Sequence, residues 1–282
     1  AALADSLGEC LHHRRRVRHR GRWRPQGLLD RSGQESGRIL LTGDIQTMTL
    51  GPDGTCWLMG HAPDTLWRVA SGGIPASASA PLSLSEAPHS LAWSGNRRLW
   101  WTEASASRAV GWHPEATPSC VTWPIPEGLE PALAASTDSV WVVSRGSRTA
   151  WRLESTSGSL LTAIDLETPA SGQVAVDPNG FAWVTTTTRE GGTSLKKLDG
   201  THVIRSVTPV RSPVSLVTAD ALGYVWLLAR DASTLMRLVP ATGEQRVFWD
   251  ETMVRPEAMG TSDSGETWVA SPGMITRFVV GL

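Results

Sequence analysis

The chain has 282 residues, of which 40% are hydrophobic, and its 26 basic and 27 acidic side chains give a formal net charge of −1. This balance excludes a global positive field that would attract nucleic acid or an anionic membrane, so we expect no nucleic-acid partner. The apolar content is well above that of disordered chains. No uninterrupted apolar stretch reaches the roughly 18 residues of a membrane-spanning helix, so no membrane span is expected.

The first 43 residues contain a weak copy of a unit that recurs along the rest of the chain. Residues 4–11 (ADSLGECL) parallel residues 219–226 (ADALGYVW), and Trp23 lies 44 residues before Trp67. Residues 12–24 form a basic run that is rich in arginine. Charge runs of this kind are usually solvated, although the run could also contact an acidic partner.

From residue 44 onward, a tryptophan that follows a turn marks each copy of the unit. Neighbouring anchors are 41 to 43 residues apart, and a repeat of about 40–45 residues is typical of a propeller blade with four strands. The six anchors are Trp57, Trp100, Trp141, Trp183, Trp226 and Trp268. We expect their rings to pack between neighbouring blades, where each ring buries about 150–250 Å².

Short apolar runs separated by turn residues fill each unit, as residues 213–244 illustrate. Three runs rich in Val and Leu are bounded there by Gly, Pro, Asp or Thr, which is typical of short antiparallel strands. The sequence therefore predicts an all-β chain that forms a single domain over residues 1–282. This domain is a β-propeller of seven blades, each with four antiparallel strands, and the blade over residues 1–43 is degenerate. A monomer is expected.

The last unit ends at Leu282 after its third strand, so its outer strand is missing from the sequence. Propellers avoid an unpaired edge by closing with a strand from the other terminus. With seven blades, the closing strand would lie upstream of Ala1, which is consistent with a chain truncated at its N-terminus. With six blades, residues 38–42 would close the ring instead. We favour seven.

One rim of the central channel gathers the starts of the inner strands and the ends of the second strands. Aligning the units on their anchors places Gln46, His89, Gly172, Val214 and Glu257 at inner-strand starts, with Glu130 and Pro131 close by, and His61, Glu103, Arg145 and Arg230 at second-strand ends. His89 is the candidate catalytic base, and Glu103 and Glu257 are candidate ligands of a divalent ion. A lone His or Glu at a strand end is more often a solvated or capping group.

Other chemistries lack their sequence signals. The chain has no HxH or HExxH pattern, no GxSxG with a placed base, and no GxGxxG or Walker loop, so a serine hydrolase and nucleotide chemistry are disfavoured. Three cysteines without CxxC spacing predict neither a zinc site nor a closed disulfide framework. The sequence does not distinguish a cytoplasmic protein from a secreted one.

Several segments resemble the blades of the virginiamycin B lyase family. Residues 88–93 (PHSLAW), 99–103 (LWWTE) and 110–114 (VGWHP) resemble the P-H-G-I-A, L-W-F-T-E and I-G-R-I-x-P patterns of those blades. Residues 235–244 (LMRLVPATGE) resemble the family's I-G-R-I-D-P-x-T-G-E segment. The likeness extends over nearly the whole chain at the level of the repeat.

The resemblance implies a seven-bladed propeller that confers antibiotic resistance, because it linearises streptogramin B antibiotics by elimination across a ring ester with a magnesium ion. The family's site uses a His that opens one blade and a Glu-x-His that opens the next. His89 matches the first position, whereas the next unit opens with Glu130-Pro131-Ala132 and the chain has no Glu-x-His.

Two hypotheses of different class follow. In the first, the protein is a magnesium-dependent carbon–oxygen lyase that acts on a small cyclic peptide at the central channel. His89 is then the base, and Glu103 and Glu257 bind Mg²⁺. In the second, it is a non-catalytic propeller that binds a peptide, a sugar or a protein on its rim.

Overall fold

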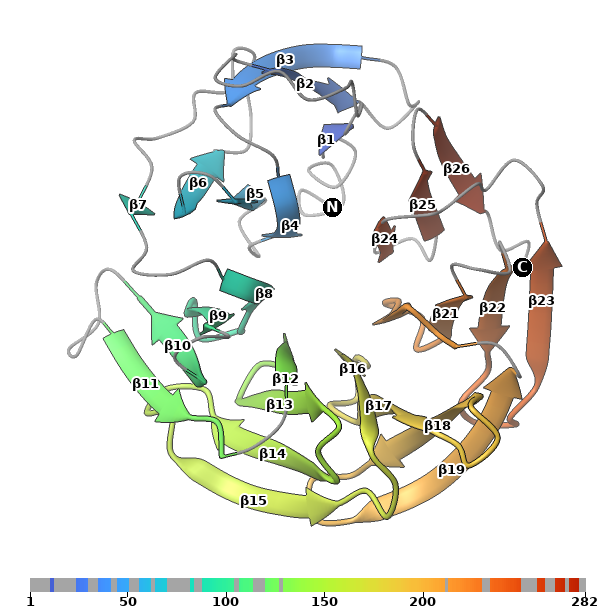
Figure 1. Ribbon diagram of the computed structural model, residues 1–282. Coiled ribbons are helices and arrows are strands. Elements are labelled where there is room, and N and C mark those ends of the chain that lie inside the picture. The colour runs from blue at the N-terminus through green and yellow to red at the C-terminus, as the bar shows by residue number, and fades with distance from the viewer. Residues whose placement is uncertain are drawn as a thin grey trace.

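The computed structural model describes 16 ranges of the chain, and the longest of them covers residues 129–210. The ranges are 11–12, 24–29, 35–41, 45–50, 56–61, 64–69, 82–83, 88–103, 107–113, 120–126, 129–210, 213–229, 234–249, 258–261, 267–271 and 274–278. Within them every regular element is a β-strand, and the strands form antiparallel sheets around a common centre (Figure 1). The prediction of an all-β propeller is confirmed.

Five sheets have four described strands each. They are β4 (Ile45–Leu50) to β7 (Leu82–Ser83) with β5 (Cys56–His61) and β6 (Asp64–Val69); β8 (Pro88–Trp93), β9 (Leu99–Glu103), β10 (Arg108–Trp112) and β11 (Cys120–Pro124); β12 (Leu129–Ala135), β13 (Ser139–Arg145), β14 (Thr149–Glu154) and β15 (Leu160–Asp165); β16 (Ala170–Val176), β17 (Ala182–Thr187), β18 (Thr193–Leu198) and β19 (Val203–Val210); and β20 (Leu216–Ala219), β21 (Val225–Ala229), β22 (Thr234–Leu238) and β23 (Gln245–Trp249).

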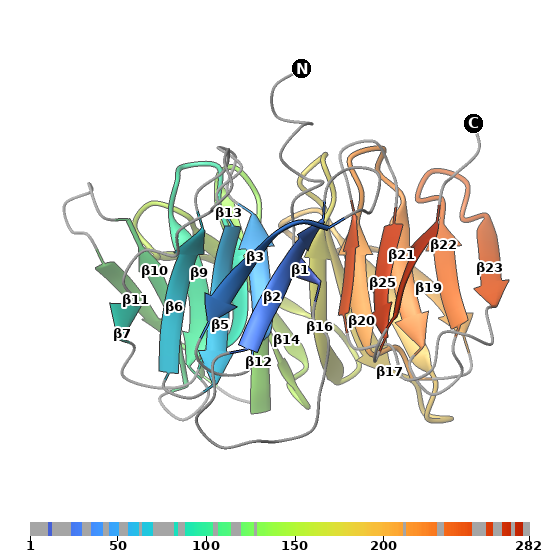
Figure 2. The same ribbon diagram turned by 90° about the horizontal axis from the view of Figure 1, so that it is seen from above.

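Each of these sheets is a meander in which consecutive strands pair from the centre outward. The inner strands β4, β8, β12, β16 and β20 ring the centre, and β7, β11, β15, β19 and β23 lie at the perimeter (Figure 1). Seen from the side, the sheets stand next to one another like the blades of a fan (Figure 2). Below, these five sheets are called blades 2 to 6 in chain order.

The first and last described sheets have three strands each. The first consists of β1 (Leu11–His12), β2 (Arg24–Leu29) and β3 (Glu35–Leu41), and the last consists of β24 (Ala258–Thr261), β25 (Thr267–Ser271) and β26 (Met274–Phe278). Among the described strands, β3 pairs with β2 rather than with β26, so residues 38–41 belong to the first sheet. The number of complete blades stays a prediction.

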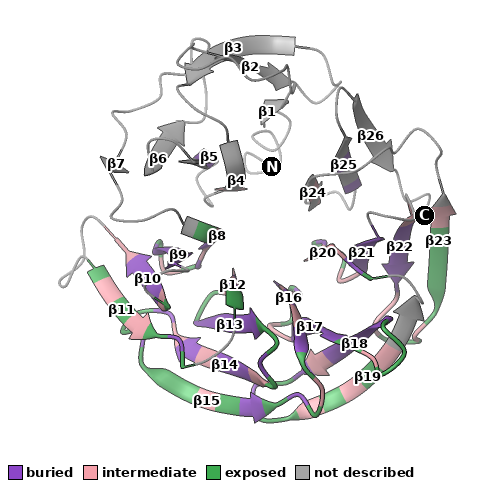
Figure 3. Ribbon diagram, viewed as in Figure 1, coloured by how far each residue is buried: buried purple, intermediate pink, exposed green. Residues whose placement is uncertain are grey.

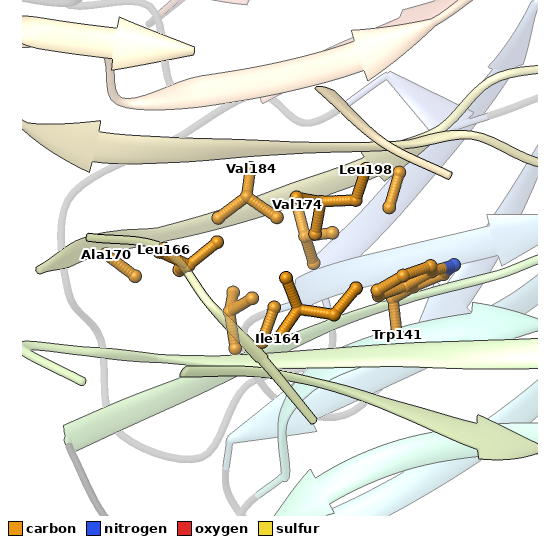
Figure 4. Close-up of a cluster of buried hydrophobic side chains, with 10 residues drawn as sticks. Trp141, Ile164, Leu166, Ala170, Val174, Val184 and Leu198 are labelled. Carbon is orange, nitrogen blue, oxygen red and sulfur yellow. The ribbon is translucent and has the colours of Figure 1, made fainter. Parts of the chain in front are cut away.

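The hydrophobic core lies between blades, and the tryptophan anchors form its centre. Trp100, Trp141, Trp183 and Trp226 are fully buried, and Trp57 is 7% exposed. Trp141, for example, belongs to a cluster that also contains Ile164 of its own blade and Val174, Val184 and Leu198 of the following blade (Figure 4). The interpretation of these five rings as core is confirmed, whereas the side chain of Trp268 lies outside the described residues. Toward the perimeter the strands become exposed, as β15 and β23 show (Figure 3).

A buried aspartate holds the turn before the anchor in blades 5 and 6. Asp220 is 1% exposed, and its Oδ1 accepts hydrogen bonds from the backbone N–H groups of Leu222 and Tyr224. Its Oδ2 accepts a 2.7 Å hydrogen bond from the indole Nε1 of Trp226. Asp177 makes the same three bonds in blade 5, where Trp183 is the indole donor. One carboxylate therefore ties the hairpin to the core.

In five of the described sheets a long basic residue lies opposite the anchor tryptophan, whereas blade 3 has Gly111 opposite Trp100. The space is filled by Arg98, which is 2% exposed and donates a 3.1 Å hydrogen bond to the Gly111 carbonyl. A Cβ added to Gly111 would lie 2.7 Å from the Trp100 ring and 2.8 Å from Cδ of Arg98. In blade 3 the guanidinium next to the anchor therefore comes from the turn before β9 and not from the third strand.

We expect the Gly111→Arg substitution to destabilise the fold by at least about 2 kcal/mol, because overpacking a filled core costs this much. Urea unfolding measures the loss. The double variant Arg98→Ser/Gly111→Arg should recover part of it, because the serine vacates the space and restores the pattern of the other blades. Wild-type stability of the single variant would contradict this account of the packing.

No helix within the described ranges has the length and apolar character that crossing a bilayer requires.

Candidate functional site

The inner strands carry a β-bulge at the same place in four successive blades. In β8 the register runs from Pro88 opposite Glu103 to Ser90 opposite Thr102, which leaves His89 as the extra residue. Gln46 is the extra residue in β4. β12 also has one extra residue, between Leu129 and Ala132, and β16 has two, between Ala170 and Val174. Bulges re-aim side chains and are common next to active sites.

These bulges coincide with the column of rim positions predicted from the sequence. Gln46, His89, Glu130 and Gly172 all lie within the shifted segments. Two of the four have a left-handed backbone, with φ of +46° at Glu130 and +90° at Gly172. Glycine tolerates this conformation, whereas a glutamate adopts it only where the surroundings impose it.

Hydrogen bonds from the second strands hold the bulges of blades 4 and 5 in place. The Thr102 hydroxyl donates a 2.8 Å bond to the carbonyl of Pro131, which connects β9 to the bulge of β12. In blade 5, the Ser171 hydroxyl donates to that of Thr185 at 2.6 Å, and Thr185 donates to the carbonyl of Gln173 at 3.3 Å. Since these contacts restrain the backbone, the rim is preorganised.

His89, the predicted base, is exposed at the bulge of β8. Its imidazole forms no hydrogen bond or ion pair with any other residue in the described ranges. A general base must be able to reach the proton that it removes, and an exposed imidazole meets this condition. The assignment of His89 as a catalytic residue stays a prediction.

Glu103, a predicted metal ligand, is only 2% exposed and lies at the end of β9. Its Oε1 accepts a 3.0 Å hydrogen bond from Nε1 of Trp101, and its Oε2 forms an ion pair with Nε of Arg108. Magnesium requires carboxylate oxygens that can approach it to about 2.0–2.1 Å. Because both oxygens already have partners, this arrangement does not fit a magnesium ligand.

Glu257, the second predicted ligand, lies outside the described residues. Within the described part of the chain, no group of three His, Cys, Asp or Glu side chains is placed to hold a metal ion. His89 and Glu103 come from adjacent strands at the same rim, but one is exposed and the other is buried. Their roles, and that of Glu257, remain predictions.

An ion pair at the rim of blade 4 was not assigned a function from the sequence. Nη1 of Arg145 lies 2.9 Å from Oε2 of Glu130, and both side chains are about half exposed. Gly172 of the next blade adjoins them, since a Cβ there would lie 3.4 Å from Cβ of Arg145. Leu129, next to Glu130, is 72% exposed, the highest value among the large apolar side chains in the described ranges.

The sequence contained part of the signal for this pair. Glu130 and Arg145 were aligned with an inner-strand start and a second-strand end of one unit. The exposure of Leu129 depends on the bulge, which no propensity indicates. The described rim therefore combines an imidazole, a carboxylate, a guanidinium and an apolar side chain.

Comparison with solved structures shows a fold shared with streptogramin B lyases. A structure described as streptogramin B lyase superposes with a TM-score of 0.67 at 15% identity, over 90% of this chain and 85% of that chain. A catalytically inactive histidine-to-alanine variant of virginiamycin B lyase from Staphylococcus aureus, solved with quinupristin, has a TM-score of 0.68 at 16% identity, over 90% and 87%. The selenomethionine form of that enzyme gives 0.60 at 14%, over 84% and 85%.

No family model matches the sequence, and no curated protein matches it either. The structural superpositions confirm the resemblance seen in the sequence, at the level of the fold.

Proposed function

We propose that the rim formed by the bulges of blades 3 and 4 binds a peptide-like ligand. The observation that carries this proposal is the repeated bulge, which places the exposed His89 and Glu130 at the starts of adjacent inner strands. Glu130 forms an ion pair there with Arg145 at the end of β13. The inner strands β8 and β12 are in contact, and Ser90 accepts a 3.1 Å hydrogen bond from the backbone N–H of Leu133.

The chemistry of these side chains favours a ligand with both polar and apolar parts. Arg145 and Glu130 offer donors and acceptors for carbonyl and amide groups, and the exposed Leu129 offers apolar area. Ligand sites usually combine apolar surface with a few polar groups that fix orientation. A peptide backbone with apolar side chains has the matching composition.

A binding measurement with a streptogramin B depsipeptide tests the proposal. We expect saturable binding by isothermal titration calorimetry, and the Arg145→Gln variant should bind about tenfold more weakly, since it loses a charge-assisted hydrogen bond. The unfolding temperature of the variant should stay close to that of the wild type, because an exposed ion pair contributes at most about 1 kcal/mol.

Arg97→Gln is the matched control, because Arg97 is also exposed but lies in the turn at the opposite end of blade 3. Equal affinities of the two variants would contradict a role for the blade 4 rim. Absence of binding by well-folded wild-type protein would exclude this ligand class, and a screen of sugars and linear peptides would follow.

A second candidate function is carbon–oxygen elimination on a cyclic depsipeptide. It is favoured by the exposed imidazole of His89 and by the fold shared with streptogramin B lyases. In such a reaction the imidazole would remove the acidic proton of the substrate, and the electron pair of that C–H bond would form a carbon–carbon double bond. The bond between the adjacent carbon and the ester oxygen would break, so that the ester group leaves as a carboxylate. Ring opening changes the charge and the fragmentation of the depsipeptide, so mass spectrometry detects it.

Magnesium remains the ion to test for this candidate, and no ligand for it is assigned among the described residues. The incubation should therefore be run with magnesium and, in parallel, with a chelator. Turnover that stops in the chelator would support a metal-dependent lyase whose ligands differ from Glu103.

A further inference from the structure

Two pairs of like charges lie at the end of blades 5 and 6 opposite to the rim described above. Lys197 of β18 is directly opposite Arg205 of β19, and Arg237 of β22 is directly opposite Arg246 of β23. β19 and β23 lie at the perimeter of neighbouring blades (Figures 1 and 3). Like charges in directly opposite positions of an antiparallel pair are destabilising.

Only one cation of each pair belongs to the repeat. Lys197 and Arg237 are the basic residues opposite the anchor tryptophans, and they lie over aromatic rings, with Lys197 Nζ 3.8 Å from the centroid of Phe181. In blade 4 the equivalent Arg152 faces Thr162 and has a carboxylate nearby, 3.9 Å away on Asp138. Arg205 and Arg246 on the outer strands of blades 5 and 6 are therefore not part of the repeat pattern, since blade 4 has Thr162 at the equivalent position.

These four cations form no ion pair with any other residue in the described ranges. Arg205 instead donates hydrogen bonds to the carbonyls of Pro240 and Thr242, which places it against the turn between β22 and β23. Arg237 is only 9% exposed, and its Nε and Nη1 have no hydrogen-bond partner. The guanidinium of Arg237 lies 4.6 Å from the centroid of the Tyr224 ring. A buried cation without a carboxylate partner is costly, so its charge favours an anion bound nearby.

The acidic residues of the two hairpins do not neutralise this charge. Asp199 accepts hydrogen bonds from the backbone N–H groups of Thr201 and His202 and forms an ion pair with His202. These bonds, and above all the one from Thr201, lower the pKa of Asp199 to about 2. Glu244 is exposed and forms no ion pair in the described part of the chain.

We propose that this end of blades 5 and 6 binds the phosphate group of a small molecule, with Arg246 as its principal contact and the enclosed charge of Arg237 directly opposite it in the ladder. Guanidinium groups match phosphate oxygens in geometry and form strong charge-assisted hydrogen bonds with them. Arg246 is exposed, and its guanidinium lies 5.2 Å from the centroid of the Phe248 ring. The partly exposed Arg205 extends the positive surface toward blade 5.

Isothermal titration calorimetry with pyrophosphate at constant ionic strength tests this site. We expect saturable binding and a rise in unfolding temperature that follows it. Arg246→Gln should weaken binding about tenfold. Arg246→Glu should abolish binding and also raise the unfolding temperature of the free protein, because Glu opposite Arg237 replaces a repulsive pair with an attractive one. A purely structural role of Arg246 would not produce this opposite pair of effects.

Arg189→Gln is the matched control, since Arg189 is exposed and lies at the other end of blade 5. Pyrophosphate binding that is equal in Arg246→Gln and wild-type protein would overturn the proposal. So would the absence of saturable binding, or binding of an oligonucleotide by a protein that does not bind pyrophosphate.

Discussion

Asp220→Ala is expected to destabilise the propeller by about 3 kcal/mol, because it leaves three donors without their acceptor. The Nε1 group of Trp226 and the backbone N–H groups of Leu222 and Tyr224 all bond to this one carboxylate, and each unsatisfied buried donor costs about 1–3 kcal/mol. For a chain of this size the unfolding temperature should fall by roughly 6 to 12 °C. Thermal unfolding followed by circular dichroism measures the change.

Asp165→Ala serves as the control for this experiment. Asp165 is 69% exposed, and it accepts one backbone hydrogen bond and forms a surface ion pair with Arg148, so its loss should cost less than about 1 kcal/mol. Asp177→Ala, in the equivalent turn of blade 5, should behave like Asp220→Ala. Similar stabilities of the Asp165 and Asp220 variants would show that the indole bond contributes little.

If the protein is a lyase, His89→Ala should lower kcat by a factor of about 10²–10⁴, the usual contribution of a general base. The stability should change by no more than about 0.5 kcal/mol, because the imidazole is exposed and has no partner in the described ranges. Rates of depsipeptide ring opening, followed by mass spectrometry, and a melting curve of the same sample separate the two effects.

His202→Ala is the matched control for this variant, since His202 is an exposed histidine at the opposite end of blade 5. It should keep the wild-type rate. Full turnover by His89→Ala would remove His89 from the catalytic role while leaving the rim as a binding site. Depsipeptide affinity that falls together with the rate would instead indicate that His89 positions the ligand.

The architecture was predictable from the sequence because the same weak strand signals recur at regular intervals along the chain. A single run such as 225–229 is ambiguous, but the same run after a turn at six regular positions is not. The spacing of the tryptophans also predicted their burial between blades, which Trp141 and Trp183 confirm. The sequence did not predict that Arg98 fills the space beside Trp100 in place of a basic residue at position 111. This packing depends on the three-dimensional space around Trp100 and not on the register of the strands.

The candidate site was predictable only in part. Alignment of the units found the column that contains His89 and Glu130, since inner-strand starts occupy equivalent places. It did not reveal that Glu103 is enclosed by Trp101 and Arg108, because one partner precedes it in the strand and the other follows a turn. Side-chain partners of this kind depend on local geometry. The sequence alone does not show whether the oxygens of a carboxylate already accept hydrogen bonds from neighbouring side chains.

The bulges also bear on how this rim could change over time. A bulged residue has no directly opposite partner in the ladder, so its side chain is under little constraint from the neighbouring strand. Equivalent positions here hold glutamine, histidine, glutamate and glycine without a change of fold. The propeller thus separates the residues that maintain it, the tryptophans between blades, from the residues at the bulges of the rim. At His89, which is exposed and has no left-handed backbone, single substitutions can change the chemistry of the rim with little effect on the stability of the scaffold.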